Sequence, residues 1–302
     1  MSISKIPIAR IVMTNMIGRR FENPGKLILG LLILVFSFYG HTQPKEEIEL
    51  PKGGKEIEFK HLTNLYSLYI TKNQEVYNDG KKLQYFQDVG YTLQHQKNSI
   101  APGVSFKTLI YADSKVYYSF IEKIKYQLAI DPRRVYFMTN DFYGFTGMYY
   151  RFTSYYNQEI AIEKITTLEE DIFNAENGEE FFVDIVNPWE FDFEKNLYEG
   201  KKKGVEKTLQ EVKTEVIEVG KNKSINYKGA IINAGKLENL VTQNQIIFLK
   251  FAEGIYYEDY IYCIQEVKRI RTELRQKNKK GAYIIELSSK LINLLKENNI
   301  KL

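Results

Sequence analysis

A pattern of strand, turn and helix occurs twice in this chain, and the repetition restricts the fold more than any other feature. The two copies are FKTLIYADSKVYYSFIEKI at residues 106–124 and IIFLKFAEGIYYEDYIYCI at residues 246–264. Each copy begins with an apolar run of strand length, continues with alanine and an acid, and then has a Tyr-Tyr pair. In the first copy, residues 120, 121, 124 and 128 are apolar, which is the spacing of one helix face.

The segments around each copy also correspond, so the repeated unit is larger than the motif. ITKNQEVYNDG at residues 70–80 aligns at a constant offset with VGKNKSINYKG at residues 219–229. Strand-like runs precede these segments and close each unit, and a helical segment at residues 82–96 has apolar residues at 83, 86, 89 and 93. Each unit is therefore predicted to contain strand, turn, helix, strand, helix and strand.

We predict an α+β protein with two small repeated units, each a mixed three- to four-stranded sheet with two helices on one face. An aromatic-rich connector joins them. The predicted boundaries are 1–43 for a signal peptide or signal anchor, 44–64 for a linker, 65–140 for the first unit, 141–212 for the connector, 213–290 for the second unit and 291–302 for a C-terminal helical segment. We call the two units the first and second repeat.

The N-terminal region differs in kind from the rest of the chain. Leu27–Gly40 is an uninterrupted apolar run that follows Arg19, Arg20 and Lys26. Its length suits the apolar core of a signal peptide, because a membrane span needs about 20 apolar residues. We expect a cleaved signal peptide, with an uncleaved anchor as the alternative. Either form predicts an exported, periplasmic protein that meets the membrane only through this segment.

Removal of the export segment changes the charge balance. The full chain has 42 Lys and Arg and 38 Asp and Glu, but residues 1–43 contain five of the basic residues and one of the acids. The remainder has 37 of each and is neutral. Nucleic-acid binding depends on a basic field that releases counterions, so this class of partner is excluded.

Few residues suggest catalysis or metal binding. Cys263 is the only cysteine, so no intrachain disulfide or thiolate metal site can form, and its apolar neighbours predict a buried, unreactive thiol. The three histidines, His41, His61 and His95, do not form an HExxH motif, and no phosphate-binding glycine loop is present. We therefore predict neither a cofactor nor a metal ion.

The repeated positions are the only candidate site residues, and we expect their role to be structural. They are Asp113, Tyr117, Tyr118, Glu253, Tyr256 and Tyr257. Asp113 and Glu253 recur after the buried strand, where a carboxylate accepts hydrogen bonds from backbone N-H groups at a helix start.

The aromatic run FYGFTGMYYRFTSYY at residues 142–156 has two interpretations. It predicts either a pair of strands that packs on the first repeat or an exposed binding patch, because Tyr and Phe are frequent in binding hot spots.

The motif Ala112-Asp113-Ser114-Lys115-Val116-Tyr117-Tyr118 resembles the periplasmic domain of the ExbD/TolR family of biopolymer-transport proteins. Ala252-Glu253-Gly254-Ile255-Tyr256-Tyr257 resembles it more loosely and is one residue shorter. The resemblance implies a small mixed sheet covered by two helices, a periplasmic location, homodimerisation and a role beside a proton-driven motor that energises the outer membrane. That role depends on an Asp in a transmembrane helix. Leu27–Gly40 has no ionisable residue, so proton transport is not carried over to this chain.

These observations predict a non-enzymatic envelope protein that binds a protein partner or peptidoglycan, as an accessory to a Ton- or Tol-type transport complex. Two alternatives remain open at this point. An extracytoplasmic hydrolase would need a cleft where His95 or His61 meets several carboxylates. A structural or adhesive surface protein would present the aromatic run at 142–156 as its contact surface.

Overall fold

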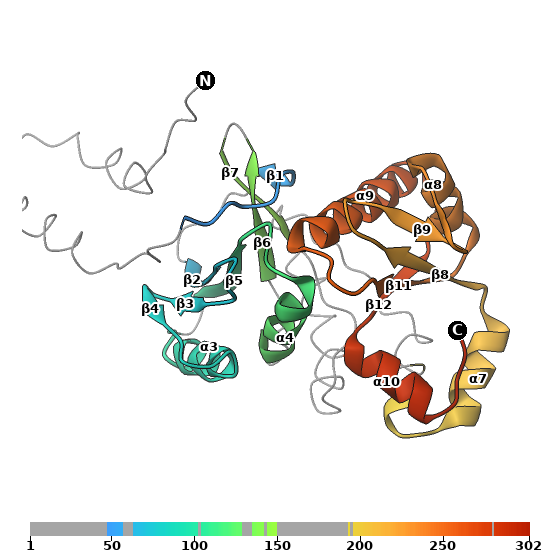
Figure 1. Cartoon of the computed structure of the whole chain (residues 1–302), viewed down its shortest axis with the longest axis horizontal. Coiled ribbons are helices and arrows are strands. Elements are labelled where there is room, and N and C mark those ends of the chain that lie inside the picture. Colours follow the sequence, from blue (N-terminus) through green and yellow to red (C-terminus); the bar gives the residue numbers. More distant parts are fainter. Residues whose placement is uncertain are drawn as a thin grey trace, which may run out of the picture. The chain divides into compact units, whose positions relative to one another are not determined.

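Both predicted repeats are present, with the same elements in the same order (Figure 1). The computed structural model describes residues 47–56, 63–101, 104–128, 135–141, 144–149, 193, 196–279 and 281–302. The first repeat contains β2 Thr63–Ile70, β3 Val76–Asn78, β4 Lys81–Lys82, α3 Asp88–Asn98, β5 Ser105–Ala112, α4 Tyr118–Leu128 and β6 Val135–Asp141. The second contains β8 Thr214–Val219, β9 Ile225–Tyr227, β10 Ala230–Ile231, α8 Ala234–Gln243, β11 Ile246–Phe251, α9 Tyr257–Gln276 and β12 Tyr283–Leu287.

Each repeat is built around three parallel strands with a short antiparallel hairpin at one edge. Within the described residues, the first sheet has the order β1-β7-β6-β5-β2-β3-β4 and the second the order β10-β9-β8-β11-β12. Strands β1 Lys55–Glu56 and β7 Gly144–Tyr149 extend the first sheet beside β6. The predicted α+β class with two mixed sheets is confirmed. The sheets have more strands than expected because β1, β3, β4, β9 and β10 have only two or three residues, too few to show an alternating pattern, and because β7 comes from the aromatic run that was assigned to the connector.

The edge hairpins have the same turn in both repeats. The central residues of the first turn, Asp79 and Gly80, have φ angles of 47° and 73°, and those of the second, Lys228 and Gly229, have 50° and 81°. A two-residue hairpin turn of this kind needs positive φ at both central positions, and glycine adopts that conformation without a steric cost. The turn that was predicted in each unit is therefore present in both repeats.

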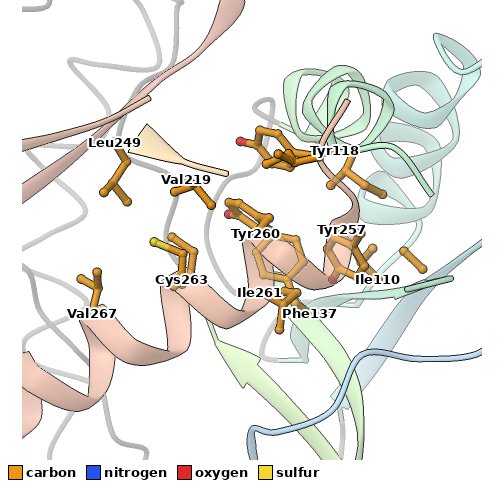
Figure 2. Close-up of a cluster of buried hydrophobic side chains, with 14 of the residues drawn as sticks. Ile110, Tyr118, Phe137, Val219, Leu249, Tyr257, Tyr260, Ile261, Cys263 and Val267 are labelled. Atoms are coloured by element: carbon orange, nitrogen blue, oxygen red, sulfur yellow. The ribbon is translucent and has the colours of Figure 1, made fainter. Parts of the chain in front are cut away.

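One face of each sheet packs against two helices, α3 and α4 in the first repeat and α8 and α9 in the second. Alternating strand residues such as Tyr66, Leu68 and Ile70 supply this face, because successive side chains of a strand point to opposite sides. Apolar residues of both copies of the repeated motif are buried: Leu109, Ile110, Ile247 and Phe248 on strands, and Phe120, Ile124, Ile261 and Ile264 on helices. The apolar side chains of both repeats form one continuous cluster, part of which is drawn in Figure 2.

The second sheet is covered on its other face as well. Helices α7 Lys202–Glu211 and α10 Ser289–Glu297 pack there with Phe193 and Leu197, around Ile246, Phe248 and Ile285 (Figure 1). Strand β11 thus contacts apolar groups on both sides, which explains the buried apolar run Ile246–Leu249 that precedes the exposed Lys250. Helix α10 overlaps the predicted C-terminal helical segment 291–302 but begins at Ser289 and ends at Glu297, and it covers the second sheet.

Two sequence expectations differ from the structure or fall outside it. The first helix begins at Asp88, so Leu83 and Phe86 precede it, although both still pack against the core. In the aromatic run, Gly144–Tyr149 forms β7, whereas residues 142–143 and 150–156 lie outside the described residues. The export segment 1–43, His41 and His61 lie outside them as well.

Among the helices that the structure describes, none combines the length and the apolar character needed to cross a bilayer.

The continuous core predicts that the two repeats unfold together. We expect Ile110→Ala to lower the free energy of unfolding by about 2 to 5 kcal/mol, because it leaves a cavity in a filled interior. Urea unfolding followed by circular dichroism measures this change, with Ile231→Ala as control because Ile231 is 76 % exposed. An unchanged midpoint for Ile110→Ala, or two separate transitions, would contradict the shared core.

Candidate functional site: the interface between the repeats

The two repeats meet at the Tyr-Tyr pairs that the sequence singled out. Tyr117 and Tyr256 form an isolated antiparallel bridge, and their rings stack with centroids 5.3 Å apart. The backbone N-H of Tyr118 donates to the carbonyl of Ile255 at 3.0 Å, and that of Tyr257 donates to the carbonyl of Val116 at 2.8 Å. Equivalent residues therefore make reciprocal contacts, which is the mark of a local two-fold axis at this bridge.

This symmetry corrects the alignment of the two acids. Tyr118 is equivalent to Tyr257, and the strand pairs Ile70–Ala112 and Val219–Phe251 continue the same register. Asp113 is thus equivalent to Ala252 rather than to Glu253, and the second motif is not one residue shorter. The sequence alignment was wrong by one residue here because neighbouring Ala and acidic residues in both copies gave a false match.

Asp113 and Glu253 consequently have different roles. Asp113 is buried and accepts hydrogen bonds from the backbone N-H groups of Lys115 at 2.9 Å and Glu49 at 3.0 Å, ahead of α4 rather than within its first turn. Glu253 is exposed. In the second repeat the helix-start role belongs to Asp259, which accepts from the N-H groups of Tyr256 at 2.9 Å and Lys223 at 2.8 Å.

Residues 47–54, which we call the strap, lie along both repeats. The strap is bound to the first repeat through the N-H of Ser114, which donates to Glu49, and the N-H of Asn140, which donates to Pro51. It is bound to the second repeat through the side chain of Gln265, which donates to the carbonyl of Lys52 at 3.1 Å. This part of the predicted linker is therefore attached to the folded units.

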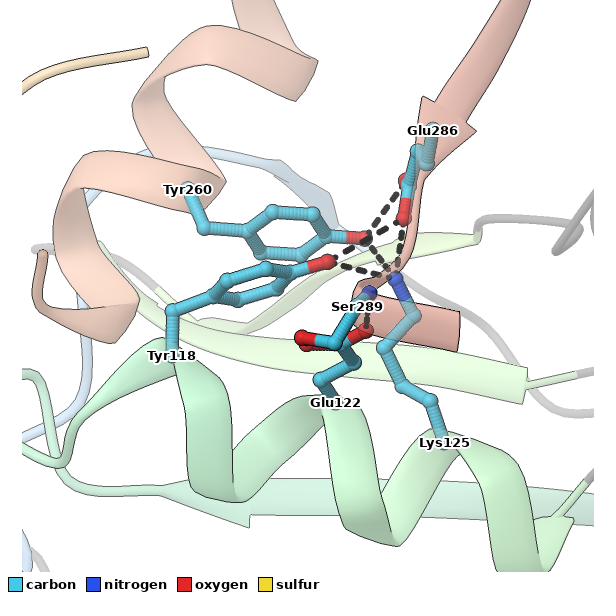
Figure 3. A network of polar contacts seen from close by, with 6 residues as sticks. All are labelled: Tyr118, Glu122, Lys125, Tyr260, Glu286 and Ser289. Carbon is cyan, nitrogen blue, oxygen red and sulfur yellow. Dashed lines mark hydrogen bonds and ion pairs between the residues drawn. The ribbon is translucent and has the colours of Figure 1, made fainter. Parts of the chain in front are cut away.

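A buried polar network crosses the interface and is the strongest candidate site in the described residues (Figure 3). Lys125 on α4 forms an ion pair with Glu286 on β12, and the two side chains are 1 % and 6 % exposed. The Lys125 ammonium also donates to the hydroxyl of Tyr260 at 3.0 Å and to that of Tyr118 at 3.3 Å. Both hydroxyls in turn donate to the Glu286 carboxylate, at 3.0 Å from Tyr260 and 3.3 Å from Tyr118.

The geometry satisfies every charged group in this network. Each phenol accepts from the ammonium and donates to the carboxylate, so neither charge faces apolar atoms alone. Two charges taken out of water are costly unless further hydrogen bonds accompany their attraction, and the two tyrosines supply these bonds. Cys263 lies nearby, and burial, together with the charges of Glu286 and Glu266, raises the pKa of its thiol to about 12. The prediction of a buried, unreactive thiol agrees with this environment.

The same interface has a second polar contact at its margin. Glu122 on α4 accepts hydrogen bonds from the backbone N-H of Ser289 and from its hydroxyl, the latter at 2.9 Å. Ser289 begins α10, so the carboxylate lies at the positive end of that helix. The network therefore connects α4 to two elements of the second repeat (Figure 3).

On the opposite side of the local axis the equivalent positions are apolar. Lys125 corresponds to Ile264 in the same register, and Glu286 corresponds to Phe137, because β12 pairs with Leu249 and β6 with Ile110 at these residues. The ring of Tyr257 faces Phe137 with centroids 6.0 Å apart. Its hydroxyl is buried and has no hydrogen-bond partner among the described residues. Among the described residues, the network thus lies on one side of the axis only.

Of the network residues, Tyr118 was predicted from the sequence, whereas Lys125, Tyr260 and Glu286 were not. Two signals were visible. Lys125 occupies a position on the apolar stripe of its helix, four residues after Ile121, and Glu286 interrupts the apolar strand YIIEL. A charge within each pattern, opposite in sign and in different repeats, indicates a buried pair.

Other chemically active residues do not form a site in the part of the chain that the structure describes. His95 lies on α3 beside the ring of Tyr91, at 6.5 Å between centroids. Within the described ranges, no group of three or more His, Cys, Asp or Glu residues is placed to hold a metal ion.

No family model matches this chain, and no curated protein or solved structure matches it either. The assignment of the interface therefore depends on the contacts and the internal symmetry of this chain.

We expect removal of one partner of the Lys125–Glu286 pair to destabilise the protein strongly, and removal of both partners to change the free energy of unfolding little. Lys125→Met should lower the free energy of unfolding by about 3 to 5 kcal/mol, because it leaves a buried carboxylate without its counter-charge. The double variant Lys125→Met with Glu286→Leu should be close to wild type or more stable. Urea unfolding tests both, with Lys123→Met on the exposed face of α4 as control. Equal losses in the single and double variants would contradict this account.

The two equivalent tyrosines should respond in opposite ways to loss of the hydroxyl. Tyr118→Phe removes a partner of the buried charges and should cost about 1 to 3 kcal/mol, whereas Tyr257→Phe removes an unpaired buried hydroxyl and should be neutral or stabilising. Thermal unfolding of both variants decides the matter. A similar loss for both would show that the Tyr257 hydroxyl has a partner.

Proposed function

We propose that this chain is a non-enzymatic, exported envelope protein that acts by binding another protein, through tandem domains of the ExbD/TolR type. The observation behind this proposal is that the reactive groups are buried between the two repeats. Lys125, Glu286 and Cys263, together with the two network tyrosines, are buried at the joint between the repeats, where the charged and phenolic groups bond to one another. Such groups hold the units together, and a substrate does not reach them.

The shared core favours a binding role because it makes the two repeats one body. A surface presented on packed elements needs little further ordering on association, so less of the interaction free energy is lost. The strap adds contacts to both repeats and supports the same arrangement.

The first repeat presents the aromatic groups that suit a protein partner. Tyr85 and Tyr91, just before and on α3, are 60 % and 75 % exposed. Tyrosine combines a large apolar ring with a polar hydroxyl and is frequent at the energetic centres of protein interfaces. We assign the binding surface to these two side chains.

The place of this protein beside a Ton- or Tol-type complex follows from the family resemblance, which is also the basis of the proposed periplasmic location. The apolar N-terminal run lacks an acid, so the proposal assigns an accessory role in contact with such a complex and no part in proton movement.

Site-specific photo-crosslinking tests this function. A photoreactive amino acid at position 91 of the full chain should form an adduct with a specific envelope protein in cells, identified by mass spectrometry, and Tyr85→Ser should reduce the yield. The same reagent at position 231, equally exposed but on the second repeat, is the control.

Three results would contradict the proposal: no protein adduct at position 91 above that at the control position 231, recovery of the chain outside the envelope fraction, or adducts with peptidoglycan fragments alone. The last result would replace the protein partner by peptidoglycan.

A further inference from the structure

The two sides of the local two-fold axis differ in a way that bears on which units can associate. On one side the interface holds the Lys125–Glu286 ion pair, and on the other it holds Ile264 and Phe137 at the equivalent positions. Lysine comes from the first repeat and glutamate from the second. The ion pair therefore forms only when a first repeat meets a second repeat.

Each homotypic association would separate the two charges that pair in this structure. If two first repeats met about this axis, each Lys125 would face Phe137, the residue that stands in place of Glu286. If two second repeats met, each Glu286 would face Ile264. In either case two buried charges lose the opposite charge that they contact in this structure, which strongly destabilises an interface. Two copies of the same repeat, whose surfaces are otherwise similar enough to associate, are thus prevented from pairing.

We propose that the Lys125–Glu286 ion pair determines which repeats can associate, and we call this role the pairing code. It restricts this interface to the combination of a first and a second repeat, and it rejects both homotypic combinations. The surface fits the complementary repeat of the same chain or of a second copy of the chain, in which case two chains exchange repeats and keep every contact of the interface.

Charge exchange in the full-length chain tests the code. Lys125→Glu places two carboxylates together, and Glu286→Lys places two ammonium groups together, so neither single variant can pair within one chain. When the two variants are refolded together, the introduced carboxylate at position 125 of one chain can meet the introduced ammonium at position 286 of the other. The unchanged Lys125 and Glu286 of the two chains can meet in the same dimer.

We expect mixed dimers in native mass spectra, at least about tenfold more abundant than any dimer of either variant alone. The double exchange in one chain should give the same species as the wild type, because the introduced charges then attract each other within that chain.

The controls separate the code from general damage. Lys123→Glu, an exposed charge reversal on the same helix, should fold as wild type and give the same species as wild type in native mass spectra. If a single variant fails to fold alone, the code still requires that co-refolding with its complement yields soluble mixed dimer and that the double exchange folds. Absence of mixed dimer, failure of the double exchange, or a homodimer of one single variant as abundant as the mixed species would each overturn the proposal.

Discussion

The arrangement of the described residues depends on burial of apolar surface between two similar units about a local two-fold axis. Each repeat has a three-stranded parallel centre with two helices on one face, and neither completes its core alone. Tyr118, Phe137, Tyr257 and Tyr260 come from both repeats and occupy the same cluster (Figure 2). Because the apolar face of one repeat is covered by the other, the packing within each repeat and the packing between the repeats depend on the same side chains.

Most of the fold could be predicted from the sequence because the repeats combine two independent signals. Apolar periodicity located strands and helices, and self-similarity showed that a strand-turn-helix order was used twice. Leu109, Ile110, Ile247 and Phe248 were placed correctly because unbroken apolar runs of strand length seldom occur except on buried strands. The start of α3 was placed too early because Leu83 and Phe86 contact the core from a turn, and periodicity does not distinguish a turn from a helix at that point.

The candidate site was less predictable, for a physical reason. A buried ion pair depends on two residues far apart in sequence, here Lys125 and Glu286, and each looks like an ordinary surface charge when it is considered alone. The pairing of Asp113 with Glu253 failed because similarity of residue type does not fix register, whereas backbone hydrogen bonds do. The Tyr-Tyr pairs were the reliable signal, since they lie on the axis itself.

The strap has a mechanical consequence. It lies on the N-terminal side of both repeats, and its backbone is bonded to residues of each, from Ser114 and Asn140 in one to Gln265 in the other. A pull on the chain from that side would load several hydrogen bonds in parallel, spread over both units, before it reached the first strand of the first repeat. A tension applied at the N-terminal end therefore acts on both repeats at once, and the two repeats would move together as one rigid body.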